Sequence, residues 1–259
     1  MVPGIAAALI GDPVYAQGVA TFTLEILGHA QSETKIKRVE SLLFGLEELL
    51  KKHDPKFEFE KSSSQEVRDL LETAIINASR ANTESKIERL RKVVFGHIVD
   101  PQPYDYTTRY LDLGVRLNDD QVLILKMFVE TEVDLHDLRE KLKDLRIISE
   151  NAKDVELAMF ASDSKASSKQ KEVFKYKKDI HKKEMENTEF DFESVVNKRR
   201  RMISKYPEDE FQFLFNDLRV LGLIYNPAEG RASNTGDQAY YQCTALANGF
   251  MKYLSEDSG

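Results

Sequence analysis

The last fifty residues constrain the fold most, because one short stretch carries the signals of a helix end, two strands and a final helix. Residues 217–254 read DLRVLGLIYNPAEGRASNTGDQAYYQCTALANGFMKYL, and Gly222 follows the last helical residues. LIY and AYYQCT are typical of strands, and the residues between them are turn formers. This order of elements predicts the back half of a winged helix, with its recognition helix at about Glu208 to Leu221.

The composition predicts a mostly helical protein with one or two hydrophobic cores. The chain has 259 residues, 41% of them hydrophobic, and its seven prolines and twelve glycines are too few for a β-sandwich. A single cysteine, Cys243, leaves no intrachain disulfide, which suits a reducing cytoplasm. The first thirty residues contain no Lys or Arg, and Asp12 and Pro13 interrupt their apolar run, so we expect no secretory signal there. No stretch of about 18 uninterrupted apolar residues predicts a membrane span, and a packing segment is favoured over membrane contact.

Residues 1–115 are predicted to form a helical bundle behind this apolar N-terminal segment. Apolar residues recur at helical spacing in three stretches, which begin near residues 32, 63 and 83. The first stripe consists of Ile36, Val39, Leu43, Leu46 and Leu50. A stripe of about two heptads is too short to be stable alone, so it must pack either on the 67–78 helix of its own chain or on a second copy in a homodimer.

Residues 116–259 are predicted to form a winged-helix-like domain with one small β-hairpin. Asn118 caps a helix that begins the domain, and a new helix starts at Asp191. Residues 161–190 are rich in Lys and Ser and contain few large apolar residues, so they are expected to be a charged linker or an exposed helical insertion. The predicted fold class is therefore mainly α, with a bundle followed by this domain.

Three stretches together resemble uncharacterised bacterial helical proteins that end in a winged-helix-like domain. They are ESKIERLRKVVFGHI (84–98), LNDDQVLILKMF (117–128) and the closing LRVLGLI…YYQCTALANGFMKYL. The resemblance covers about two thirds of the chain and contains no catalytic motif. It implies an interaction or regulatory role in a mobile-element or phage-defence setting, and it transfers no site residues.

The helix at 208–221 is expected to have a buried face and a partner-binding face. Phe211, Leu214, Phe215 and Leu218 share the inward face. The outward, partner-binding set is Asp209, Gln212, Phe213, Asn216 and Val220. Residues 206–259 hold three basic and eight acidic residues, so the domain would repel DNA. Phe213 and Val220 favour a protein partner, although Gln212 and Asn216 could read adenine edges.

A basic stretch keeps DNA binding open as an alternative. Residues 161–205 carry thirteen basic and eight acidic residues and include the run NKRRR at 197–201. Arg199 lies within an apolar stripe, so it is expected to reach an acidic partner inside the protein. The candidate phosphate contacts are Lys198, Arg200, Arg201 and, in the wing, Arg231. A solvated charged face explains the same residues without any ligand.

No catalytic, cofactor or metal motif is present in the sequence. The five histidines have no HxxH or HExxH spacing, and the glycines lack the Lys and Ser or Thr of a phosphate loop. The favoured hypothesis is a non-catalytic, cytoplasmic interaction or adaptor protein without cofactor, whose partner is another protein or a second copy. The alternatives are a winged-helix DNA-binding regulator and a membrane-associated effector that uses residues 3–28.

Overall fold

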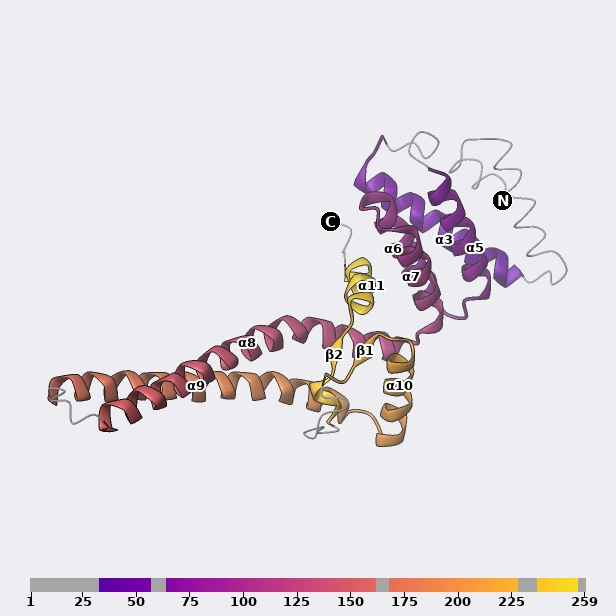
Figure 1. Ribbon diagram of the computed structural model, residues 1–259. Helices are drawn as coiled ribbons and strands as arrows, with labels where there is room; N and C mark the ends of the chain where they lie inside the picture. Colours follow the sequence, from indigo (N-terminus) through magenta and orange to yellow (C-terminus); the bar gives the residue numbers. More distant parts are fainter. Residues whose placement is uncertain (1–32, 57–63, 162–167, 228–236, 256–259) are drawn as a thin grey trace. The chain divides into compact units, whose positions relative to one another are not determined.

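The computed structural model describes residues 33–56, 64–161, 168–227 and 237–255. Within these ranges the protein is mainly helical, with eight α-helices, one 3-10 turn and one antiparallel two-stranded hairpin (Figure 1). In chain order the elements are α3 (Glu33–His53), α5 (Gln65–Arg80), α6 (Glu84–Val99), α7 (Tyr104–Arg116), α8 (Asp119–Ala161), α9 (Ser168–Ile203), α10 (Glu208–Val220), β1 (Ile224–Tyr225), η1 (Gln238–Tyr240), β2 (Gln242–Cys243) and α11 (Ala245–Ser255). The prediction of a mainly α protein with one small hairpin is confirmed.

The chain divides into two compact units. The first contains the described residues up to Leu123 together with α11, and the second runs from Ile124 to Thr244. In the first unit, α3, α5, α6 and α7 bury their apolar stripes against one another, which is the stable arrangement for short amphipathic helices. The N-terminal stretch 1–32, a candidate for packing or membrane contact, lies outside the described residues.

The stripe of α3 packs within its own chain. Val39, Leu43, Leu46 and Leu50 are at most 2% exposed, and α3 packs against α5 and α6. Arg91 of α6 also donates to the carbonyl oxygen of Ser41 at 2.9 Å, which fixes α3 on α6. These four residues therefore pack within their own chain, as the first alternative expected, and self-association of the protein stays a prediction.

The last helix, α11, belongs to the first unit, whereas the sequence placed it beside the hairpin in residues 116–259. Its Tyr253 ring lies against Gly96 of α6, in space that a side chain at Gly96 would fill. Tyr110 of α7 contacts Tyr253 edge-on, with ring centroids 5.5 Å apart. The Tyr110 hydroxyl group lies against Gly249 of α11, in the space that a side chain at Gly249 would fill. Aromatic rings accommodated by two glycines therefore hold α11 on the bundle.

In the second unit, α8 and α9 lie side by side and run antiparallel (Figure 1). Ion pairs join them along their length, at Lys141–Glu184 (3.3 Å), Arg146–Glu189 (3.7 Å) and Glu156–Lys178 (2.6 Å). The prediction that a new helix starts at Asp191 is wrong, because α9 continues through that residue. No Pro or Gly interrupts residues 168–203, and Lys and Glu are good helix formers.

A short hairpin follows α10. Gly222 adopts φ +72° directly after the helix, a conformation that L side chains rarely adopt, so the predicted glycine stop is confirmed. Ile224 then pairs with Cys243 and Tyr225 with Gln242. Most of the predicted turn between the strands, residues 228–236, lies outside the described residues.

Candidate protein-interaction surface

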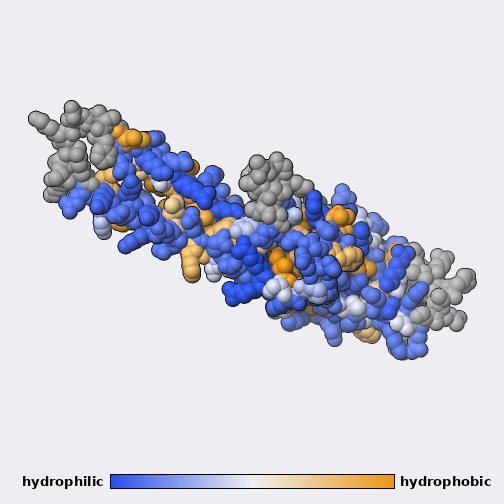
Figure 2. Space-filling model, turned by 90° about the horizontal axis from the view of Figure 1, so that it is seen from below, coloured by the Kyte–Doolittle hydropathy of each residue, from blue (hydrophilic) through white to orange (hydrophobic). Residues whose placement is uncertain are grey.

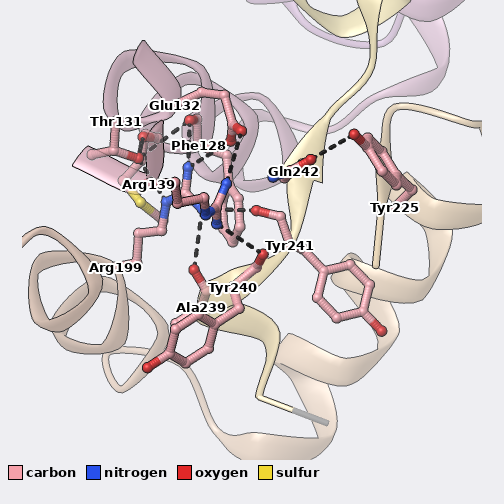
Figure 3. Close-up of polar contacts among 11 residues, drawn as sticks. Phe128, Thr131, Glu132, Arg139, Arg199, Tyr225, Ala239, Tyr240, Tyr241 and Gln242 are labelled. Carbon is pink, nitrogen blue, oxygen red and sulfur yellow. Dashed lines mark hydrogen bonds and ion pairs between the residues drawn. The ribbon is translucent and has the colours of Figure 1, made fainter. Parts of the chain in front are cut away.

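The second unit is organised around a buried arginine on α9. Arg199 is fully buried, and its guanidinium carbon lies 4.3 Å from the centre of the Phe128 ring. Its nitrogens donate to acceptors on α8 and on the segment before and beside β2 (Figure 3). These acceptors are Thr131 Oγ1 (2.6 Å), the Phe128 carbonyl (2.9 Å), Glu132 Oε2 (3.0 Å), the Ala239 carbonyl (3.1 Å) and the Tyr241 carbonyl (2.8 Å).

This cluster confirms that Arg199 points inward to an acidic partner, which is Glu132. Burial lowers the pKa of Arg199, and the hydrogen bond to Glu132 opposes that shift. The planar guanidinium joins α8, α9 and the hairpin because its donors point in fixed directions. With its donors occupied by protein acceptors, Arg199 has a structural role and offers nothing to a ligand.

Two further arginines surround the cluster. Arg200 donates to Asp237 Oδ2 at 2.9 and 3.1 Å, and its pKa is raised chiefly by this hydrogen bond. Arg139 lies 3.6 Å from Glu132 and contacts the Tyr240 carbonyl oxygen at 3.5 Å. Together they hold residues 237–241 on α8 and α9, so Arg200 is engaged within the unit rather than presented to a phosphate.

The same packing fixes α10. Glu208, Asp209 and Glu210 lie in its first turn, where carboxylates favour the positive end of the helix dipole. Its inner face is buried at the four predicted positions, Phe211, Leu214, Phe215 and Leu218. Phe215 lies 4.8 Å from the Tyr241 ring and 5.9 Å from the Phe128 ring, measured between centroids. The helix is therefore anchored to the segment that Arg199 holds.

The outer face of α10 carries the predicted partner-binding residues. Phe213 is 67% exposed and Val220 is 84% exposed, and both lie on the side away from the core. Asp209 and Asn216 are also exposed, whereas Gln212 is half-buried. The structure thus presents four of the five residues to solvent on one rigid helix.

The predicted basic residues are divided by the fold. Arg231 lies outside the described residues, and Arg200 is paired with Asp237. Lys198 and Arg201 are exposed and line an open groove of about 610 Å³ together with Lys205. Met127, Val195 and Met202 supply apolar lining. Lys205 was not predicted from the sequence, because it lies in the turn after α9 ends at Ile203, where helical spacing does not relate it to Arg201.

In the described part of the chain, no three His, Cys, Asp or Glu side chains are grouped so that they could hold a metal ion. Among the same residues no helix has the length and apolarity needed to cross a membrane. Burial raises the pKa of the Cys243 thiol to about 12, with a smaller contribution from Glu132, so this thiol is protonated near neutral pH.

Comparisons with known proteins identify no relative. No family model, no curated protein and no solved structure matches the chain.

Proposed function

We propose that this protein is a non-catalytic interaction or adaptor protein that binds a protein partner through the outer face of α10. The observation that carries the proposal is the exposure of Phe213 and Val220 on one rigid helix. Residues seven apart lie on the same side of a helix, two turns from one another. Two large apolar anchors at this spacing are typical of a helix that inserts into a partner's apolar groove.

The proposal includes the finer fold assignment made from the sequence. We place α10 and the β1–β2 hairpin as the helix and wing of a winged-helix-like domain, with the long α8–α9 hairpin as its insertion. The net charge of residues 206–259 is −5, which opposes contact with phosphates. The first turn of α10 is acidic, so the partner groove is expected to have a basic rim.

The test is partner binding by the full chain and by variants of the α10 face. Phe213→Ala and Val220→Ala are each expected to weaken binding of a co-purified partner by about 1 to 3 kcal/mol, with little dependence on salt. Leu157→Ala on α8 is the matched control, because Leu157 is 68% exposed and lies on another helix. A partner that binds the double variant as tightly as the wild type would rule out this face.

DNA binding is the second candidate, favoured by one observation. Lys198, Arg201 and Lys205 line one groove and form no ion pair with any described residue. Under the adaptor proposal, duplex DNA is expected not to bind detectably at physiological salt. A complex that weakens steeply with salt and disappears in Lys198→Glu/Arg201→Glu would favour the regulator instead.

The cytoplasmic location and the membrane alternative stay expectations. The first follows from the use of a single cysteine. The second concerns residues 3–28, which lie outside the described ranges. Fractionation of cells that produce the full chain would test both, since a membrane-associated effector would sediment with lipid.

A further inference from the structure

The outer face of α9 has the spacing of a coiled-coil seam. Residues 173, 176, 180, 183, 187, 190 and 194 follow one another at alternating steps of three and four, which keeps them on one side of the helix. We call them the outer seam; they are Val173, Tyr176, Ile180, Lys183, Asn187, Phe190 and Ser194. The opposite side of α9 packs on the core through Thr188, Val196 and Arg199, which are at most 2% exposed.

The outer seam exposes large apolar side chains to solvent. Val173 is 50%, Tyr176 68%, Ile180 45% and Phe190 75% exposed. Figure 2 shows apolar side chains interrupting the hydrophilic surface over the two long helices. Val173, Tyr176 and Ile180 form an apolar group at heptad spacing, and Phe190 lies on the same side of the helix beyond two polar seam positions. Lys183 and Asn187 stand at the two core positions between Ile180 and Phe190, where polar residues set the register of a paired helix.

The seam continues into the basic groove. Lys198 and Arg201 follow Ser194 at steps of four and three, and all three line the groove, so the groove lies on the same side of α9. Lys205 joins the groove from the turn that follows the helix. From Val173 to the end of α9 at Ile203 the surface is about 45 Å long at about 1.5 Å per residue. One end is apolar and the other carries three cations, which form no ion pair within the described ranges. A helix that covers this surface must match apolar side chains at one end and positive charge at the other.

The charges beside the seam oppose pairing with a second copy. From residue 172 to residue 198 the flanking heptad positions hold six acidic and two basic residues: Glu172, Asp179, Glu184, Glu186, Asp191, Glu193, Lys177 and Lys198. Two α9 seams set against each other would bring mostly like charges together in either helix direction, and like charges at these positions direct partner choice away from self. A partner helix with basic flanking residues would meet complementary charge.

We infer that the outer seam and the basic groove together bind an amphipathic helix of another protein. Its core positions are apolar opposite the four apolar seam residues and polar opposite Lys183 and Asn187. Its flanks carry Lys or Arg, and its acidic end lies over the basic groove. Seam and groove lie on α9 and are distinct from the α10 face, so this helix is a second point of attachment beyond the proposed function.

The experiment places a photo-crosslinking amino acid at Tyr176 of the full chain in its source cell and maps the crosslinked segment by mass spectrometry. The same substitution at Val133, 66% exposed on α8, is the matched control. We expect a Tyr176-specific crosslink to an amphipathic segment that has basic flanks and an acidic end. A peptide of that segment should bind the purified full chain at least about ten-fold more weakly in Phe190→Asp and in Lys198→Glu/Arg201→Glu.

Four results would overturn the inference. The first three are a crosslink to a second copy of this chain, a crosslink to nucleic acid, and no crosslink above the Val133 control. The fourth is a peptide that binds both variants as tightly as it binds the wild type. The substituted side chains are exposed, and circular dichroism is expected to match the wild type. Failure of the α10 proposal would be seen separately, because Phe213→Ala and Val220→Ala leave the outer seam intact.

Discussion

In the first unit, α3 buries Val39, Leu43, Leu46 and Leu50 almost completely against neighbouring helices, whereas in the second unit α9 leaves Val173, Tyr176, Ile180 and Phe190 about half exposed or more. Both helices carry apolar residues at steps of three and four. The difference is the number of neighbours: α3 packs within a bundle, and beyond the Arg199 cluster α9 is paired with α8. The same sequence pattern therefore forms a buried core in the first unit and a solvent-exposed surface in the second.

The largest effect is expected at the arginine that holds the second unit together. Arg199→Met should destabilise that unit by about 3 to 5 kcal/mol, because it removes the buried hydrogen bonds to Glu132 and to the carbonyls of Phe128 and Ala239. Hydrogen exchange read separately for each unit measures this, and the first unit should be unaffected. Arg201→Met, an exposed neighbour, should stay within about 0.5 kcal/mol of the wild type. Equal effects of the two changes would refute the structural role of Arg199.

A truncation in each unit tests the contrast between α3 and the long hairpin directly. Leu46→Ala removes a fully buried side chain of the bundle and should cost about 2 to 5 kcal/mol. Ile147→Ala on α8, which is 48% exposed, should cost no more than about 0.5 kcal/mol in the purified chain. Urea denaturation followed by circular dichroism measures both. A large loss for Ile147→Ala would mean that this side of the hairpin is already covered, for example by self-association.

How much the sequence could predict depends on how local each feature is. The helical class, the buried face of α10, the stop at Gly222 and the inward direction of Arg199 all follow from spacing within one or two turns. The pairing of Arg200 with Asp237 joins residues 37 apart, and no local pattern indicates it. The placement of α11 depends on Gly96 and Gly249 meeting aromatic rings from distant helices. The helix break expected at Asp191 does not occur, because an uninterrupted run of helix formers has a larger effect than one potential cap residue.

Alkaline pH is expected to weaken the second unit through Cys243. The folded-state pKa of this thiol is raised from 9.0 to about 12, so the unfolded chain releases its proton first. The protonated thiol's contribution to the free energy of unfolding is fully present below about pH 9. It is lost as pH rises toward 12, by at most about 1.4 kcal/mol per pH unit. The measurement is the free energy of unfolding from pH 8 to 10.5 under reducing conditions. Cys243→Ala should show a shallower decline, and parallel curves for the two proteins would contradict the assignment.

Acid should act on the first unit through His97, with a smaller effect. Burial lowers the pKa of this histidine, while Glu66 raises it to a lesser extent, and Nδ1 lies 2.9 Å from Thr107 Oγ1. The folded state favours the neutral ring. The contribution of His97 to the free energy of unfolding is therefore fully present above about pH 6.5, the ordinary pKa of histidine, and it falls as pH drops below that value. Hydrogen exchange of the first unit between pH 7 and 5 should show this loss, and His97→Gln should reduce its pH dependence. The wild type and His97→Gln, compared in the same buffers, provide the control. If the first unit weakens in acid as steeply in His97→Gln as in the wild type, the acid sensitivity lies elsewhere than at His97.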